Sequence, residues 1–244
     1  RVRVRVRVRL GVSAQYASAD FDEVLGGTDT SHFHAWSWGW NTGLFFKPAA
    51  NTSIGVAYRS HVTQKAKGTN TLAGFGTNSI TAELPLPATV TVSAEQTINQ
   101  WQILGSAVYT NWHVFDKLVM TNMNIIGTNK DVTIPFNYRD TWNFALGAHY
   151  TLNKNITFLA GTGYDMTPTN NQDRDIRLPG SDRVALSLGV KALDNSGRFA
   201  IATGYTRLIA TNNAKINNNG PQIPSSTPLI ITKGTAKTSA NVFG

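Results

Sequence analysis

The feature that most constrains this chain is a two-residue alternation of apolar with small or polar side chains. The clearest run is 184–191, in which every second residue is Val or Leu, and similar runs occupy 88–95 and 142–151. Side chains of a β-strand point alternately to its two faces. The pattern therefore predicts strands with one apolar face and one small or polar face, and no segment keeps an apolar period typical of a helix.

About ten strands follow from this alternation. They are expected near 1–18, 36–47, 52–66, 87–98, 101–116, 137–152, 155–168, 182–193, 198–211 and 228–243. Many exceed the five or six residues common in soluble sheets and match the roughly 9–11 tilted residues that cross a bilayer. Their length favours a membrane barrel over a soluble sheet.

The connections between these strands alternate between long and short. Long loops are expected at Ala19–Ala35, Lys67–Leu86, Asp116–Phe136, Thr169–Ser181 and Thr211–Thr227. Tight turns are expected at Pro48–Asn51, Asn99–Gln100, Asn153–Lys154 and Asp194–Gly197, which are rich in turn-forming residues. Transmembrane barrels have short periplasmic turns and longer extracellular loops.

Composition agrees with a barrel and excludes several other classes. Hydrophobic residues make up 41% of the chain and charged residues only 15%, well below the roughly 25% of soluble domains. No apolar run approaches the roughly 18 residues of a spanning helix, and the absence of cysteine excludes disulfides. We therefore predict an all-β, antiparallel transmembrane β-barrel forming one domain over 1–244. Aromatic residues toward strand ends fit interfacial girdles, and a soluble β-sandwich is the alternative.

The positive charge is concentrated in an Arg-Val repeat at residues 1–10. The formal net charge is +8, but five of the 22 Lys and Arg residues belong to this repeat, so nucleic acid is not an expected partner. Arginines on one strand face would cost about 2–4 kcal/mol each against lipid at the membrane midplane, so they must face the lumen or water. The repeat is either an anion-attracting stripe or an engineered or poorly assigned segment.

Catalytic motifs are missing from the sequence. It has no glycine-rich phosphate loop ending in Lys and no Gly-x-Ser-x-Gly elbow. His32 and His34 flank Phe33 in the first long connection, where solvated loop histidines are a more ordinary explanation than a metal site. We expect no enzyme activity, no cofactor and no metal.

Three stretches resemble the FadL family of outer-membrane transporters for long-chain fatty acids and other hydrophobic compounds, including aromatic hydrocarbons. They are the proline-marked strand entry at 83–92, the segment 138–168 beginning Tyr-Arg-Asp-Thr-Trp, and the segment 177–190 beginning Arg-Leu-Pro-Gly-Ser-Asp-Arg. Their order and spacing over about 160 residues carry the resemblance. The Arg-Val repeat departs from the family pattern.

The resemblance implies a monomeric 14-stranded barrel whose N-terminal segment forms a hatch in the lumen. This chain resembles the C-terminal ten strands of that barrel and has no recognisable hatch. It implies that Ala19–Ala35 and Lys67–Leu86 form an extracellular groove for an apolar ligand. The expected groove residues are Phe21, Phe33, Leu72, Phe75, Ile80 and Leu84. The alternative is that these residues only pack together and close the mouth.

A lumenal cation would be needed for the carboxylate of an amphiphile. Strand phase makes Arg59 and Lys191 candidates, and Arg207 a third whose phase is ambiguous. We therefore expect passive outer-membrane uptake of hydrophobic molecules such as fatty acids, with a general porin or an outer-membrane enzyme as alternatives. Membrane lipid, lipopolysaccharide and detergent are the other expected partners of this bacterial outer-membrane protein.

Overall fold

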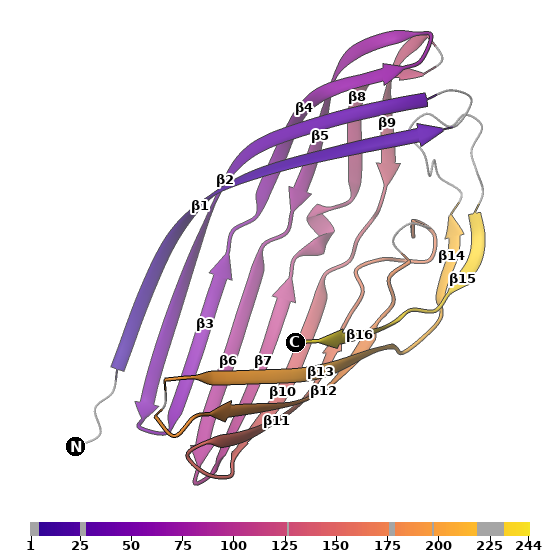
Figure 1. Cartoon of the computed structure of the whole chain (residues 1–244). Coiled ribbons are helices and arrows are strands. Elements are labelled where there is room, and N and C mark those ends of the chain that lie inside the picture. Colours follow the sequence, from indigo (N-terminus) through magenta and orange to yellow (C-terminus); the bar gives the residue numbers. More distant parts are fainter. Residues whose placement is uncertain (1–4, 25–27, 126, 176–178, 197, 219–231) are drawn as a thin grey trace.

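The structure, a computed structural model, is built almost entirely of antiparallel strands. It describes residues 5–24, 28–125, 127–175, 179–196, 198–218 and 232–244. Within those ranges the one helical turn is η1 (Trp112–Val114), and no helix there has the length and apolar character needed to cross a membrane. Most strands join one 14-stranded sheet, shown in Figure 1. The all-β prediction is confirmed.

The lower part of this sheet is the barrel wall. Its strands are β1 (Arg5–Val24), β2 (Thr28–Ala49), β3 (Thr52–Arg59), β6 (Thr89–Ile98), β7 (Trp101–Thr110), β10 (Thr141–Thr151), β11 (Ile156–Asp165), β12 (Arg183–Leu193), β13 (Ala200–Ala210) and β16 (Ser239–Phe243). They lie side by side in that order, each antiparallel to the next. Each contains part of one of the ten predicted segments.

Three of the predicted long loops are instead mostly strand. β1 and β2 occupy the described residues of Ala19–Ala35, and they pair from Arg5 opposite Lys47 up to Val24 opposite Thr28. The predicted loop Lys67–Leu86 lies within the hairpin of β4 (Val62–Leu72) and β5 (Gly76–Leu86), and Asp116–Phe136 contains β8 (Lys117–Ile125) and β9 (Thr128–Pro135). The mouth of the barrel is therefore built from ordered hairpins (Figure 1).

Threonine and glycine explain why these segments are hairpins. The strand ends beside the β4–β5 turn carry Thr71 and Thr77, whose hydroxyls hydrogen-bond at 2.8 Å across the two strands. Threonine favours the pleated conformation. Gly74 in the turn and Gly76 at the start of β5 have φ of +83° and +95°, a region that residues with a Cβ rarely adopt. The loop prediction overlooked the alternation of Ile80, Ala82 and Leu84 with polar residues on β5, because the neighbouring glycine, threonine and asparagine residues are common in loops.

Two other segments differ from their predicted boundaries. The predicted strand 52–66 breaks at Ser60, so that β3 stays in the barrel and β4 joins the upper part of β2. The predicted strand 228–243 divides into β15 (Thr232–Ala236) and β16, and β15 pairs with β14 (Ala214–Asn218) from the predicted loop 211–227. Residues 219–231 lie outside the described residues.

The two faces of the wall differ as the alternation predicts. On β12, Leu186 and Leu188 are 50% and 68% exposed on the outer face, and Ala185 and Ser187 line the hollow inside. Rings gather toward both ends of the outer face. Tyr16 packs against Trp36 and Tyr109 against Trp142 near the mouth, and Trp101 packs against Tyr150 near the tight turns, each pair with tilted rings. These bands match the aromatic girdles of membrane barrels.

The buried apolar core lies above the barrel, between the mouth hairpins. Its buried members come from β2, β5, β8, β9 and the adjoining segments, and Ala66 of β4 packs against them. They include Phe33, Ile80, Phe115, Met120, Met123, Ile125, Ile134 and Phe136. Ile80 is only 1% exposed, which places it at the centre of the cluster. A packed cluster fixes the hairpins relative to one another, so the mouth has a definite shape.

We predict that Leu188→Arg destabilises the barrel, because Leu188 is the middle residue of β12 and faces outward. An arginine against lipid at mid-membrane costs about 2–4 kcal/mol. The matched change Ser187→Arg places the same charge in the lumen and should cost under about 1 kcal/mol. Urea unfolding in lipid vesicles measures both, and equal losses would contradict the assignment of faces.

Candidate functional site

A hollow runs along the inner face of the wall. Its volume is about 770 Å³, and eight strands line it, most of them with small side chains. One register row across it contains Phe45, Gly55, Ser93, Ser106, Ala145, Gly163, Ala185 and Leu208. Because most residues in this row are small, the inner face leaves space instead of filling it. That space is large enough for an extended small molecule.

The structure divides the predicted groove residues into buried and exposed ones. Phe33, Leu72 and Ile80 are at most 7% exposed, and Leu84 packs partly buried against the same cluster as Phe33 and Ile80. Phe75, in the turn between β4 and β5, is 51% exposed. The side chain of Phe21 lies outside the described residues. Close packing at the mouth therefore accounts for most of this set, and Phe75 is left accessible.

Close approach of β2 and β4 supports this packing. Phe33 lies opposite Gly68, which in turn lies opposite Ile80. A Cβ on residue 68 would fall 1.6 Å from the carbonyl oxygen of His32, so only glycine fits there. The glycine allows the aromatic ring of Phe33 and the side chain of Ile80 to join the same cluster from two different strands.

A buried polar cluster joins the ends of the mouth hairpins. The Asn70 amide donates hydrogen bonds to the Asp29 carboxylate and, at 3.0 Å, to the Ser31 hydroxyl. The backbone N–H of Asn124 donates to the Asn70 side-chain oxygen at 2.8 Å. Asp29 is 6% exposed, and its burial raises the pKa of the carboxyl, opposed by the hydrogen bond from Asn70. Strands β2, β4 and β8 are thereby tied together through one amide.

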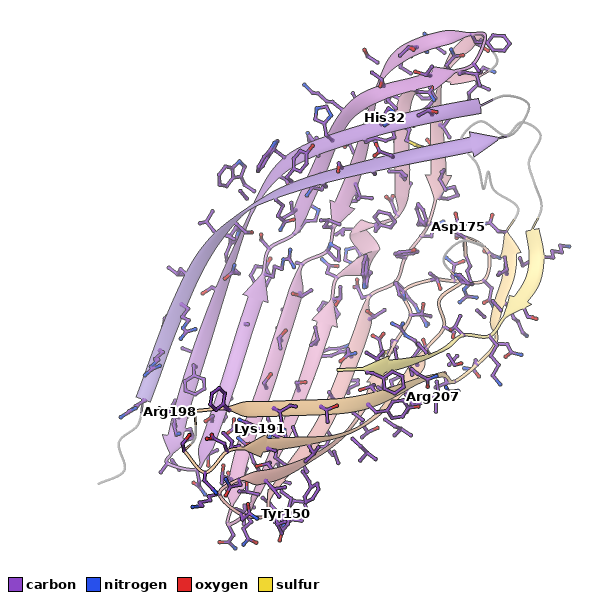
Figure 2. The ribbon with its side chains drawn as sticks, viewed as in Figure 1. His32, Tyr150, Asp175, Lys191, Arg198 and Arg207 are labelled. Atoms are coloured by element: carbon purple, nitrogen blue, oxygen red, sulfur yellow. The ribbon has the colours of Figure 1, made fainter. Side chains whose placement is uncertain are left out.

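The predicted lumenal cations lie at opposite ends of the wall. Arg59 lies opposite Asn41 and Thr89 at the mouth end of β3, and Lys191 lies opposite Thr157 near the tight turns (Figure 2). The structure does not bring them together. Arg207 faces outward opposite Leu186, and its guanidinium donates to Asn241 at 2.6 Å. The ambiguous phase of Arg207 thus resolves in favour of the outer face.

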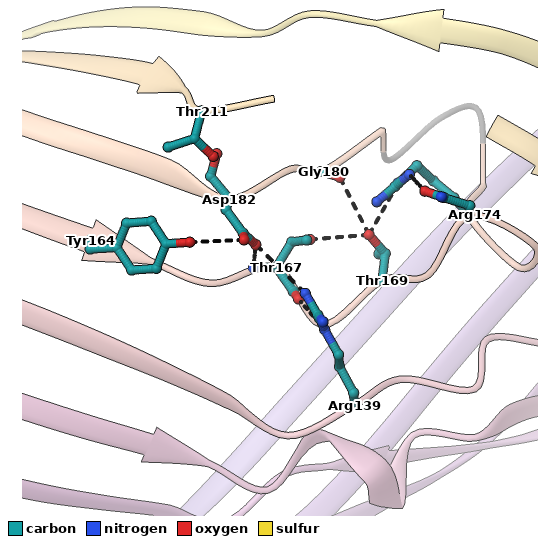
Figure 3. A network of polar contacts seen from close by, with 9 residues as sticks. Arg139, Tyr164, Thr167, Thr169, Arg174, Gly180, Asp182 and Thr211 are labelled. Atoms are coloured by element: carbon teal, nitrogen blue, oxygen red, sulfur yellow. Dashed lines mark hydrogen bonds and ion pairs between the residues drawn. The ribbon is translucent and has the colours of Figure 1, made fainter. Parts of the chain in front are cut away.

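A second polar site, which the sequence reading missed, lies where the irregular segments meet above β10–β13 (Figure 3). The Asp182 carboxylate accepts hydrogen bonds from the Tyr164 hydroxyl at 2.9 Å and the Thr167 N–H at 2.8 Å. A guanidinium nitrogen of Arg139 lies 3.8 Å from the same carboxylate, and another donates to the carbonyl of Thr167 at 3.2 Å. The network holds Arg139 at the rim of a cavity.

That cavity has a volume of about 630 Å³ and is lined by three cations, Arg139, Arg174 and Lys215, by the one carboxylate of Asp182, and by asparagine and threonine side chains. Arg174 is 5% exposed and donates to Thr169 at 3.1 Å and Asn171 at 2.7 Å. Burial, reinforced by the nearby Arg139, lowers the pKa of Arg174. The hydroxyl of Ser181 is buried at the cavity wall without a hydrogen-bond partner. Cations and free donors make this cavity suited to an anionic group.

Four of the five histidines have a polar side chain within hydrogen-bond distance, among them His61, whose ring lies 3.4 Å from the Thr63 hydroxyl. His32 contacts Asp20 at 2.7 Å, His149 contacts Gln102 at 2.9 Å, and His113 contacts Asp140 at 2.9 Å. Within the described ranges, no three His, Asp or Glu side chains gather as metal ligands.

Comparison with known proteins identifies the family. Residues 2–244 match the family described as "Outer membrane protein transport protein (OMPP1/FadL/TodX)". The chain belongs to this family. Its outer-membrane location and barrel architecture, expected from the sequence, are confirmed by this membership.

Relatives within the family include transport proteins of known name. The chain is 29% identical over 196 residues to the long-chain fatty acid transport protein of Escherichia coli K12, covering 72% of this chain and 43% of that protein. It is 29% identical over 181 residues to outer membrane protein P1 of Haemophilus influenzae, covering 69% and 38%. The chain thus spans less than half the length of these relatives.

Solved structures show the same fold. A Pseudomonas aeruginosa FadL homologue matches with a TM-score of 0.71 and 21% identity, covering 98% of this chain and 62% of that one. The Ralstonia pickettii toluene transporter TbuX matches with a TM-score of 0.60 and 18% identity over the same shares. At these identities the likeness shows the fold alone.

We predict that Asp29→Asn stabilises the mouth hairpins at neutral pH. Because the folded-state pKa of Asp29 is raised, the protein loses stability as pH rises from the ordinary value of 3.8 through the folded value. Asparagine can still accept from Asn70 and carries no charge to bury. Thermal unfolding from about pH 3 to about pH 8 should show a gain that vanishes at the acid end.

Glu83→Gln is the matched control for this experiment. Glu83 lies on the surface, 3.6 Å from Lys65, and should change stability by less than about 1 kcal/mol. If the stability change of Asp29→Asn depends no more on pH than that of Glu83→Gln, the buried carboxylate does not limit the stability of the hairpins.

Proposed function

We propose that this protein takes up hydrophobic molecules, with long-chain fatty acids as the main class, by passive passage through the outer membrane. The single observation that carries the proposal is the hollow inner face below an ordered apolar mouth, on a chain of the FadL family. Related proteins are named for transport of long-chain fatty acids and of toluene. The protein acts by binding and release and carries out no catalysis.

Capture begins at the mouth in this proposal. Phe75 offers an exposed ring for the alkyl chain, and Leu84 extends the apolar surface from β5. Phe33, Leu72 and Ile80 support that surface from below through their buried packing, and Phe21 belongs to the same end of the β1–β2 hairpin. Apolar contact supplies most of the affinity at this stage.

The acidic end of the ligand is held by cations. Arg139, Arg174 and Lys215 surround the 630 Å³ cavity beside the mouth, so this cavity takes the carboxylate first. Arg59 at the upper end of the lumen and Lys191 near its lower end act later along the path. No energy-coupling partner is needed, because the ligand moves down its concentration gradient.

The outer surface sets the other partners. The exposed leucines and aromatic bands of the wall contact the acyl chains of membrane lipid and lipopolysaccharide, and detergent replaces them in solution. The protein works as a monomer, since the path lies inside one wall.

We expect Phe75→Asp to weaken binding of a labelled fatty acid well over tenfold. Burying about 100 Å² of a ring contributes roughly 2.5 kcal/mol before the costs of binding. Barrel stability should stay nearly unchanged, because Phe75 lies in an exposed turn. Phe75→Leu keeps the apolar contact and should bind within a few-fold of the parent. Parent-like affinity in Phe75→Asp would show that the mouth residues only pack on one another.

Planar-bilayer recording separates uptake from a general porin. A channel for hydrophobic ligands should pass little steady ion current while it transfers labelled fatty acid into acceptor vesicles. A large, steady current without saturable fatty-acid transfer would favour the porin and contradict the proposal.

A further inference from the structure

The arginines of the N-terminal repeat face the lumen wherever the structure describes them. Arg5 lies opposite Lys47, Arg7 opposite Phe45 and Arg9 opposite Gly43. Phe45 lines the central hollow, and directly paired residues of an antiparallel ladder point to the same face. The valines between them, Val6 and Val8, are 58% and 66% exposed on the outer face. The repeat therefore places its arginines in the lumen and its valines on the face that meets lipid.

These arginines also line a cavity of their own. Its volume is about 440 Å³, and Arg7 and Arg9 stand over a floor of Gly43, Gly55 and Ala57. This cavity shares Phe45, Gly55 and Ser93 with the central hollow, so the two spaces adjoin. Neighbouring arginines on one face are about 6.6 Å apart along the strand. The small floor gives the guanidinium groups room to meet a ligand that moves along the wall.

The charge on this face is left uncompensated. Among the described residues, no ion pair involves Arg5, Arg7, Arg9 or Lys47. The carboxylates that line the central hollow are Glu95 and Asp165, and Asp165 is already paired with Arg183. Clefts lined by one sign of charge between low-dielectric walls concentrate ions of the opposite sign.

We propose that Arg5, Arg7, Arg9 and Lys47, here called the lumenal cation ladder, make the lumen selective for anionic amphiphiles over neutral hydrophobic molecules. The inference rests on the proposed function and assigns its preference for charged over neutral ligands to named residues. The family contains a fatty acid transporter and a toluene transporter, so membership alone leaves the choice open. A neutral hydrocarbon gains nothing from four unpaired cations, whereas a carboxylate can pass from one guanidinium to the next.

The ladder is separate from the cation cavity at the mouth. Arg139, Arg174 and Lys215 belong to the segments above β10–β13, whereas the ladder lies on β1 and β2 across the wall. Loss of the ladder should therefore change which ligands bind without removing the apolar contacts at Phe75.

Equilibrium binding of palmitate and of 1-hexadecanol to the protein in detergent micelles tests the proposal. The two probes share one alkyl chain and differ in charge. The parent should bind palmitate roughly tenfold more tightly, and the double variant Arg7→Gln with Arg9→Gln should lose that preference while its hexadecanol affinity stays the same. Arg198→Gln removes a cation from the exposed turn after β12 and should behave as the parent.

A second readout does not depend on the amphiphile. Any residual ion current through the parent in a KCl gradient should favour chloride, and the double variant should move the reversal potential toward zero.

Acetate, a carboxylate without an alkyl chain, should fail to displace palmitate at equal concentration. Displacement by acetate would show a site for free anions and overturn the proposal.

The remaining outcomes separate the two proposals. Equal affinity of the parent for palmitate and hexadecanol, or an unchanged preference in the double variant, overturns the ladder and leaves uptake intact. Failure of the folded parent to bind either amphiphile overturns the proposed function itself. Thermal unfolding of each variant confirms that binding is compared between folded proteins.

Discussion

The backbone hydrogen-bond ladder is the constraint on which the rest of this structure depends. In lipid, every backbone N–H and C=O of a spanning strand needs a partner within the protein, and antiparallel pairing supplies one. Because side chains alternate along a strand, the register of the ladder also decides which residues meet lipid and which meet the lumen. Leu188 and Ser187 are neighbours in sequence and lie in opposite environments for this reason.

The same ladder continues above the barrel, where it builds a different kind of structure. β2 pairs with β3 in its lower half and with β4 in its upper half, so one long strand belongs to both the wall and the mouth. Above the wall the inward face carries Phe33 and meets Ile80 from β5, and a conventional apolar core forms. The chain is thus hollow where lipid surrounds it and packed where water does. This contrast gives the mouth a fixed shape above an open path.

The sequence predicts the wall well because its signal is local. The alternation of β12 and the Asn99–Gln100 turn, where Asn99 has φ +54°, can each be read from a few consecutive residues. β5 and the upper part of β4 were missed because their many threonine and asparagine residues are typical of loops. The alternation of Ile80, Ala82 and Leu84 and the glycines at 74 and 76 were nevertheless readable signals of a hairpin. The Arg139–Asp182 contact was not readable, since it joins irregular segments far apart in the chain. Lys191 was placed correctly on the inner face by phase alone, but its distance from Arg59 depends on the whole sheet.

The central claim is that one face of each wall strand meets lipid while the other lines a hollow. Spin labels placed one at a time along 184–191, with the protein in lipid vesicles, test this directly. The measurement is how often each label collides with oxygen, which concentrates in lipid, and with a nickel chelate, which stays in water. The account predicts a two-residue alternation, with oxygen access at Val184, Leu186, Leu188 and Val190 and nickel access at the residues between. Uniform access to nickel at all eight positions would contradict it, because β12 would then have no face against lipid.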